Sequence, residues 1–265
     1  MSKFVLVLSD LHTGGAFGLM PPETTLSTGS VHQLNVGQQY LWHCWTDMLD
    51  KLPERIDLLI INGDAVDGPN KAEAGRGVNE PDPLWQAKHA AKMLKYQLVD
   101  KSAQIVMTTG SKYHVGYGNE TEIHLASLLN VDPPETWIHK EHEGKFYLDI
   151  AHRQSFGKRS RTASLETEIG YLLERKARAR ELLPEQTILI RSHTHSGYRS
   201  VDEQGILAIT TPSWKIQDAF AKGSANPNRL YPDNLGAIGL RLYDEPVDGS
   251  LVQVVKYLYP HPKMS

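Results

Sequence analysis

The sequence Phe4-Val-Leu-Val-Leu-Ser-Asp10-Leu-His12 joins a short, continuously apolar run to a carboxylate and an imidazole. A run of this kind is typical of a strand that is buried on both faces of a sheet. In an extended segment, residues two apart point to the same side, so Asp10 and His12 are able to bind one ion together. The stretch therefore predicts a buried strand that ends at a pair of metal ligands.

Four further apolar runs end at polar residues in the same way. In α/β sheets, ligand sites collect where loops leave the carboxyl ends of strands. Convergence of the five ends brings together two carboxylates and as many as five imidazoles, and so many ionisable groups are not buried without cations to neutralise them. We therefore expect a metal site. The runs are 56–61 before Asp64, 105–109 before Gly110, 146–151 before His152, and 187–190 before His193.

The residue types indicate which ions are expected. His193 and His195 repeat the two-residue spacing of Asp10 and His12, and Asp64, in the middle of the motif order, is best placed to bridge two ions. Imidazole and carboxylate ligands without thiolate suit Mn²⁺, Fe or Zn²⁺ better than a structural zinc or an all-oxygen calcium site. We expect two divalent metal ions, Mn²⁺ first, with Fe, Zn²⁺ and Ni²⁺ as alternatives.

In this order the motifs resemble the signature of the calcineurin-like metallophosphoesterase family, which runs D-x-H, G-D-x-x-D, G-N-H-D/E, H and G-H-x-H. The resemblance extends from Asp10 to His195, roughly the first three quarters of the chain. It implies a dinuclear centre with a defined ligand set. The implied ligands are Asp10, His12 and His195 for the first metal, Asp64 as the bridge, and His152 and His193 for the second metal.

The resemblance also implies a reaction. In it, a hydroxide that bridges the two metals attacks phosphorus in line with the leaving group of a phosphoester. His114 corresponds to the family's histidine that contacts the phosphate and assists the leaving group. No seryl or cysteinyl nucleophile is required, and we interpret Cys44, the single cysteine, as a small core residue of a helix.

Three positions depart from the family pattern. G-N-H-D/E reads here as Gly110-Ser-Lys-Tyr-His114, so the asparagine ligand is missing and two residues are inserted. Either Ser111 or a water molecule takes the place of that asparagine at the second metal. Ala151 and Ser192 replace the glycines that usually precede the late histidines, and these small residues are expected to leave the turns intact.

Apolar strands alternate with helical patterns up to His195, and strands predominate after it. Helices are expected near 37–51, 83–100, 120–130 and 164–182, and late strands at 205–211, 236–243 and 250–258. Asp82 followed by Pro83, and Asn119 followed by Glu122, are helix start signals. The resemblance implies an α/β (α+β) fold: a four-layer αββα sandwich of two mixed β-sheets flanked by helices.

Length and composition are consistent with one enzyme domain. A chain of 265 residues with 40% hydrophobic content is long enough for a single large core, so we expect residues 1–265 to form a single metallophosphoesterase domain. One cysteine excludes an intrachain disulfide and suits a reducing compartment. The apolar run 4–8 is too short for a signal peptide, and no stretch is long enough to span a membrane. We expect a soluble, cytoplasmic protein without a membrane partner, and leave its oligomeric state open.

Two long connections, 13–36 after His12 and 67–83 after Asp64, are expected as loop insertions at the rim of the site. The alternative is an ordinary surface excursion. Arg76 in the second loop is a candidate substrate-binding residue. Asp67, at the start of that loop, is expected to orient a metal-bound histidine, with surface capping as its alternative.

A basic cluster, Lys158, Arg159 and Arg161, follows His152 closely enough to reach the rim and bind further phosphates. A solvated surface explains the cluster equally well. The formal net charge of −3 argues against a broadly basic nucleic-acid-binding protein. A second basic cluster at 174–180 is better explained by a helix dipole.

These observations favour a metal-dependent phosphoester hydrolase that acts on phosphodiesters, with nucleotides or nucleic acid as substrate because of the cluster at 158–161. A phosphomonoesterase or protein phosphatase is the alternative within the same class. A non-catalytic metal-binding scaffold is the alternative from another class, supported by the missing asparagine. Metal stoichiometry separates the two classes, because two ions favour the hydrolase and one ion or none favours the scaffold.

Overall fold

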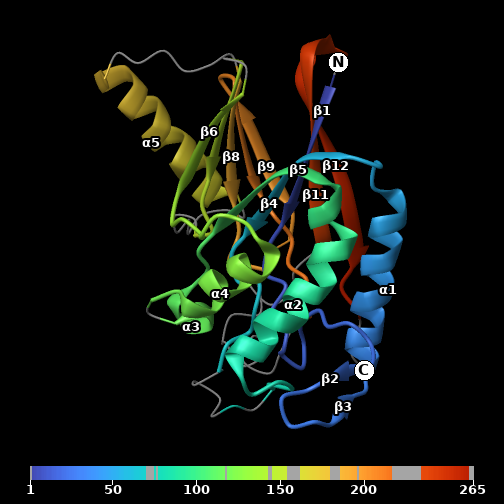
Figure 1. Cartoon of the computed structure of the whole chain (residues 1–265). Coiled ribbons are helices and arrows are strands. Elements are labelled where there is room, and N and C mark those ends of the chain that lie inside the picture. The colour runs from blue at the N-terminus through green and yellow to red at the C-terminus, as the bar shows by residue number, and fades with distance from the viewer. Residues whose placement is uncertain are drawn as a thin grey trace.

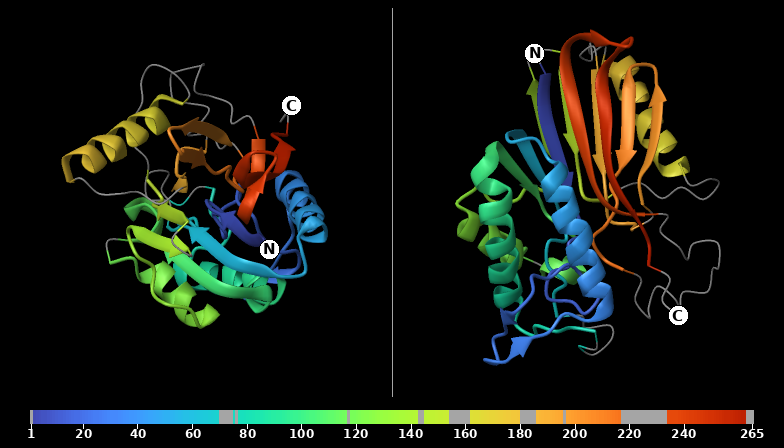
Figure 2. Two further views of the ribbon diagram at one scale, coloured as in Figure 1. Left: turned by 90° about the horizontal axis from the view of Figure 1, so that it is seen from above. Right: turned by 90° about the vertical axis from the view of Figure 1, so that its right-hand side faces the viewer.

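The computed structural model describes residues 2–69, 75, 77–116, 118–142, 145–153, 162–179, 186–195, 197–216 and 234–262. The described chain forms two five-stranded sheets that lie against each other, with helices on their outer faces (Figures 1 and 2). Among the helices in these ranges, none is both long and apolar enough to cross a membrane.

The first sheet has the strand order β12-β11-β1-β4-β5. β1 pairs in parallel with β4 and antiparallel with β11, β5 continues the parallel part, and β12 pairs antiparallel with β11. Parallel strands end at the same edge of a sheet, so the loops after β1, β4 and β5 leave from one place. The strands are β1 (Ser2–Leu8), β4 (Ile56–Asn62), β5 (Ser102–Thr108), β11 (Asn234–Val247) and β12 (Ser250–Pro260).

The second sheet has the order β6-β7-β8-β10-β9, in which β7, β8 and β10 are parallel and the two edge strands are antiparallel. Both sheets are therefore mixed, as the sequence predicts. The strands are β6 (Ile138–His142), β7 (Phe146–Ile150), β8 (Gln186–Arg191), β9 (Arg199–Glu203) and β10 (Ile206–Thr210).

The four predicted helices are present, residues 180–182 of the last one lie outside the described residues, and the short helix at 112–115 was not predicted. α1, α2 and α4 cover the outer face of the first sheet, and α5 covers the outer face of the second (Figure 2). The predicted helix at 83–100 ends at Gln97 and is followed by a single 3₁₀ turn, η2 (Val99–Lys101). The remaining elements are α1 (Val36–Lys51), α2 (Pro83–Gln97), α3 (Lys112–Val115), α4 (Glu120–Leu129), α5 (Ala163–Ala179) and a small hairpin of β2 (Thr24–Thr25) and β3 (Val31–His32).

Alternation along β1 shows how one strand serves two cores. Leu6 and Leu8 pack with the helices of the outer layer, whereas Val5 and Val7 face the second sheet. This follows because successive side chains of a strand point to opposite faces. A third apolar cluster, which includes Ile169 of α5, lies between α5 and the second sheet. The three clusters separate four layers, so the predicted αββα sandwich is confirmed.

Both predicted helix starts are correct in position, because α2 begins at Pro83 and α4 at Glu120. Asp82 accepts a hydrogen bond from the Leu84 backbone N–H at 2.8 Å, and Pro83 begins α2. Asn119 precedes α4 as predicted, but the predicted capping box is wrong, because the φ of Asn119 is left-handed at 57° and its side chain makes no capping bond to α4. Glu122 is turned inward instead and is fully buried. The Glu122 side chain therefore does not cap α4; it binds backbone N–H groups of Ala65 and Gly110.

A buried polar chain joins the carboxyl ends of the two sheets. Asn62, the last residue of β4, donates from Nδ2 to the Ala151 carbonyl at 3.2 Å and to Ser192 Oγ at 2.6 Å. Thr108 Oγ1 donates to Asn62 Oδ1 at 2.6 Å, which links β5 to the same side chain. Beyond Ser192, hydroxyl contacts of 2.7 Å continue through Thr211 to Ser9. This chain fixes the two sheets relative to each other below the site.

Replacing Asn62 with alanine should therefore destabilise the protein strongly. The Asn62→Ala variant removes the three buried hydrogen bonds that Asn62 makes to the Ala151 carbonyl, Ser192 Oγ and Thr108 Oγ1, and we expect it to lose about 2–4 kcal/mol of unfolding free energy. Urea unfolding followed by circular dichroism measures this loss. Gln39→Ala, which removes one exposed hydrogen bond to Leu34, is the control and should cost less than about 1 kcal/mol. Equal losses in the two variants would contradict the role of the polar chain.

Candidate metal centre

Pairing of neighbouring strands continues past their ends and places the predicted ligands on adjacent loops. The Asp10 backbone N–H donates to the Gly63 carbonyl at 3.0 Å, and the His12 N–H donates to the Asp64 carbonyl at 3.1 Å. The loops of the two sheets also meet, because the Trp214 N–H donates to the Asp10 carbonyl at 3.0 Å. The ligand loops are thus fixed by backbone hydrogen bonds.

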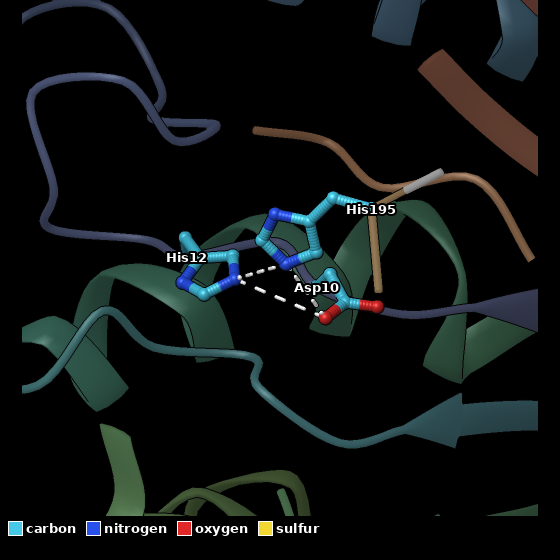
Figure 3. Close-up of side chains that lie close together, drawn as sticks. All are labelled: Asp10, His12 and His195. Atoms are coloured by element: carbon cyan, nitrogen blue, oxygen red, sulfur yellow. Dashed lines mark hydrogen bonds and ion pairs between the residues drawn. The ribbon is translucent and has the colours of Figure 1, made fainter. Parts of the chain in front are cut away.

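Asp10, His12 and His195 form the first group of converging donor atoms (Figure 3). Asp10 Oδ1 lies 3.0 Å from His195 Nε2 and 3.9 Å from His12 Nε2, and the two Nε2 atoms are 3.0 Å apart. The carboxylate oxygen and the two ring nitrogens, each of which can donate a lone pair to a metal, therefore lie within 4.8 Å of one another. The resemblance assigns the same three residues to the first metal.

The tautomer of His12 is set by Asp67, whose Oδ1 lies 3.0 Å from His12 Nδ1. Burial raises the pKa of Asp67, but its bond to His12 outweighs that effect and lowers the pKa to about 2. Burial, with help from the charge of Lys215, lowers the pKa of His12 to about 3, so its ring is neutral. An ionised carboxylate only accepts, so the proton of His12 is on Nδ1 and its Nε2 is left as a ligand atom. This contact is the one predicted for Asp67.

Asp64, His152 and His193 form the second group. Asp64 Oδ2 lies 3.0 Å from His152 Nε2 and 3.9 Å from His193 Nδ1. His152 Nδ1 lies 2.7 Å from the Asn62 carbonyl oxygen, which only accepts, so the Nδ1 proton is used there. His193 Nδ1 is buried and has no hydrogen-bond partner among the described residues. A buried nitrogen of this kind fits a metal ligand.

The two groups are neighbours. His152 Nε2 lies 4.0 Å from Asp10 Oδ1, and the His193 backbone N–H donates to Asp10 Oδ2 at 3.3 Å. Asp10 therefore lies between the groups, whereas Asp64 contacts the second group. The bridging role that the resemblance implies for Asp64 stays a prediction.

The backbone at five of these six residues is left-handed, a conformation that residues other than glycine rarely adopt and that costs about 1–3 kcal/mol each. Strain of this kind persists where the surrounding structure enforces it, and it is concentrated at functional sites. Here it turns the side chains away from their strands and toward one another. The φ angles are 50° at Asp10, 48° at His12, 50° at Asp64, 76° at His193 and 49° at His195.

The charges in the cluster compensate one another. Burial alone raises the pKa of Asp10, but His195 and His152 outweigh burial and hold that pKa well below its usual value. His152 acts in the same way on Asp64, whose pKa is also lowered. Burial lowers the pKa of His152, yet the charges of Asp64 and Asp10 raise it to about 10. In the metal-free protein a proton on His152 therefore supplies positive charge that a cation supplies when bound.

Ser111 lies at the second group, where the family pattern has its asparagine. Its backbone N–H donates to Asp64 Oδ1 at 2.7 Å, and its Oγ lies 3.2 Å from both carboxylate oxygens of Asp64. The position of Ser111 is consistent with its predicted role as a replacement ligand. Together, the nitrogen and oxygen donors of both groups fit divalent ions.

Glu122 was interpreted as part of a cap, and its role at the site was missed. Its carboxylate accepts from the Gly110 N–H at 2.7 Å and from the Ala65 N–H at 3.3 Å, so it joins the loops after β5 and β4. Burial and the neighbouring Asp64 raise the pKa of Glu122 to about 7. Gly110 also lies close to Asp64. A side chain at position 110 would not fit, because its Cβ would lie 2.2 Å from Asp64 Oδ1.

His114, on α3, lies beside the first group. Its Nδ1 is 2.5 Å from the Asp67 carbonyl oxygen, and its ring centroid is 4.4 Å from that of His12. Lys215, which sequence reasoning missed, reaches the same place, with Nζ 3.2 Å from Asp67 Oδ1. Lys215 follows the end of β10, so the strand-end rule that identified the other residues also applies to it.

Other predicted residues are not part of this cluster. The predicted substrate-binding residues Arg76, Lys158, Arg159 and Arg161 lie outside the described residues. Trp214, beside the site, is fully buried and packs edge-on against Trp45 in the core.

The predicted rim loops 13–36 and 67–83 are joined in their described parts. Glu80 is fully buried and accepts from Ser27 Oγ at 2.5 Å and from the Ser27 N–H at 2.7 Å. The Gly14 carbonyl accepts from the backbone N–H groups of Asn79 and Glu80 at 2.8 and 3.0 Å. The two connections therefore support each other.

The charge on His152 can be measured directly. With a pKa of about 10, its imidazole should be doubly protonated at pH 8 in protein stripped of metal, whereas an ordinary histidine, with a pKa of about 6.5, is neutral there. Nitrogen NMR of the imidazole rings distinguishes the two forms, and the spectrum of His152→Asn assigns the signal. Addition of Zn²⁺ should convert the signal to that of a neutral, ligated ring, because metals bind the deprotonated imidazole. A neutral His152 at pH 8 before metal is added would contradict this description of the cluster.

Comparison with known proteins gives no family model and no curated protein that matches the chain. Similar solved structures include one described as a novel archaeal phosphodiesterase, with 12% identity, a TM-score of 0.42, and coverage of 97% of this chain and 100% of that one. A dimetal phosphatase from Danio rerio has 10% identity, a TM-score of 0.42, and coverage of 91% and 93%. A Vps29 double mutant from Entamoeba histolytica has 15% identity, a TM-score of 0.43, and coverage of 97% and 99%. The fold is assigned from the chain itself, as two packed mixed sheets with helices on both outer faces, and the ordered motifs at the strand ends resemble the calcineurin-like metallophosphoesterase signature.

Proposed function

We propose that this protein is a metal-dependent phosphoester hydrolase with a centre of two divalent ions. The observation that carries the proposal is the pair of neighbouring groups at the carboxyl ends of parallel strands, each with one carboxylate and two imidazoles, in which four of the six side chains are buried. Buried ionisable groups at this density, on a strained backbone, are expected at a functional site.

In this proposal the residues divide between the two ions. When bound, divalent ions would polarise the phosphoryl oxygens and make hydroxide available near neutral pH. Mn²⁺ is the expected metal, with Fe, Zn²⁺ and Ni²⁺ as alternatives, because the donors are nitrogen and oxygen atoms. The proposed ligands are Asp10, His12 and His195 for the first ion, His152, His193 and Ser111 for the second, and Asp64 for both.

His114 is the proposed proton donor to the leaving group. Its Nδ1 is engaged by the Asp67 carbonyl, so its Nε2 is the ring nitrogen available to a substrate. The side chain is 13% exposed, so it lies at the border between the buried cluster and solvent. Asp67 positions His12 through its carboxylate and His114 through its backbone carbonyl. The ammonium group of Lys215 compensates the negative charge of the Asp67 carboxylate.

Phosphodiesters, with nucleotides or nucleic acid among them, are the proposed substrates. The sequence cluster Lys158, Arg159 and Arg161 supports this choice, since further phosphates need cations beside the reacting one. Phosphomonoesters and phosphoproteins are the competing substrates for the same centre. An assay that compares a diester with a monoester decides between them.

Hydrolysis of bis-p-nitrophenyl phosphate and p-nitrophenyl phosphate by protein reloaded with Mn²⁺ tests the proposal. We expect turnover that needs the metal, is faster with the diester, and is lost in Asp64→Asn. His114→Ala should reduce hydrolysis of alkyl esters by about 10²–10⁴-fold. It should reduce release of p-nitrophenolate much less, because that anion leaves without a proton.

Two exposed residues outside the site provide matched controls. Asp100→Asn and His43→Ala make the same chemical changes at the surface and should leave turnover unchanged. Faster hydrolysis of the monoester would replace the diester proposal with a phosphomonoesterase. Absence of turnover with Mn²⁺, Zn²⁺, Fe²⁺ and Ni²⁺, in protein shown to bind metal, would favour a metal-binding scaffold.

A further inference from the structure

α3 contains the two residues that are inserted relative to the family pattern, Lys112 and Tyr113. Both are exposed, whereas Ser111 before them and Val115 after them are buried. The single helical turn is therefore fixed at both ends and presents its middle to solvent. The insertion leaves the polar cluster intact and adds a surface directly beside it.

The turn is held tightly to the metal centre. The Ser111 N–H donates to Asp64 Oδ1 at 2.7 Å, and the His114 and Val115 N–H groups return to the Ser111 carbonyl at 2.9 and 3.0 Å. On its other side, Gly68 packs so closely that a Cβ there would lie 2.3 Å from the His114 carbonyl oxygen. Tyr113 is thus attached to a backbone that has little room to move.

The Tyr113 ring lies against His114. The ring centroids are 4.9 Å apart and the planes are nearly perpendicular, at 86°, while 42% of Tyr113 remains exposed. Of the other exposed aromatic residues in the described part of the chain, Tyr96 and Tyr171 lie on the outer helices α2 and α5, and Trp137 lies just before β6 with Arg191 over its ring. Tyr113 combines exposure with a ring contact to the proposed proton donor.

We propose that Tyr113 is a stacking platform for a nucleobase on the leaving-group side of the substrate. The inference rests on the proposed function, since it takes His114 as the residue that faces the leaving group. Aromatic side chains stack on the faces of nucleobases with little sequence preference, and one such contact typically changes affinity about tenfold or more. The substrate class is accordingly a phosphodiester whose leaving alcohol belongs to a nucleoside.

Steady-state kinetics with matched substrates test this proposal. The probes are a dinucleoside monophosphate and analogues in which one base or the other is replaced by hydrogen, because all of them keep the same phosphodiester and sugar leaving groups. In the wild type, loss of the leaving-side base should raise KM about tenfold with little change in kcat. Tyr113→Ala should abolish this ratio, and Tyr113→Phe should preserve it.

A binding measurement tests the same idea without turnover. Calorimetric titration of the Mn²⁺-loaded protein with a nucleoside 5′-monophosphate and with ribose 5-phosphate should show about tenfold tighter binding of the nucleotide, and Tyr113→Ala should remove the difference. Tyr171→Ala, which truncates a tyrosine that is 63% exposed on α5, is the matched control and should keep it.

The two proposals fail in different ways. If wild-type protein hydrolyses diesters but Tyr113→Ala keeps the wild-type preference for the base, the stacking platform is refuted and the hydrolase stands. If metal-loaded wild-type protein hydrolyses no ester, the proposed function is refuted, and the calorimetric comparison still decides whether Tyr113 binds a base.

Discussion

The burial of two carboxylates at the meeting edge of two sheets is the constraint on which the rest of this structure depends. Asp10 and Asp64 are each 1% exposed, so their negative charge must be compensated within the protein. Four imidazoles from both sheets face them, and five of the six residues adopt a left-handed backbone to do so. Bound cations would supply the positive charge that a proton on His152 otherwise supplies in this cluster. The proposed catalytic function follows from that requirement.

Contacts between residues far apart in the sequence hold the loops that carry these charged side chains. Asn62 connects β4 to the loops that carry His152 and His193, and Glu122 holds the loop of Asp64 against the loop of Ser111. Neither side chain is a proposed ligand, yet both fix the distances between ligands. The hydrolase and scaffold hypotheses share this framework. They differ in whether His114 and the adjoining surface of α3 meet a substrate.

Most of the fold was predictable because short apolar runs and helical periodicity are local properties. The positions of Asp10, Asp64 and His193 followed from the rule that polar residues after parallel strands converge. Glu122 was misread because the local sequence is the same for a glutamate that caps a helix at the surface and for one that is buried. Only its contacts with Gly110 and Ala65, which the folded chain supplies, distinguish the two. Lys215 was missed although it follows the end of β10, and only the folded chain shows its contact with Asp67, 148 residues away. The left-handed backbone has no local signal, since Asp and His are not residues that require it.

Anomalous diffraction from crystals of the protein loaded with Mn²⁺ tests the central claim most directly. We expect two manganese peaks, one among Asp10, His12 and His195 and one among Asp64, His152 and His193, separated by about 3.5–4 Å as in two-metal sites. A single peak, or no peak with His152 still bonded to Asp64, would contradict it.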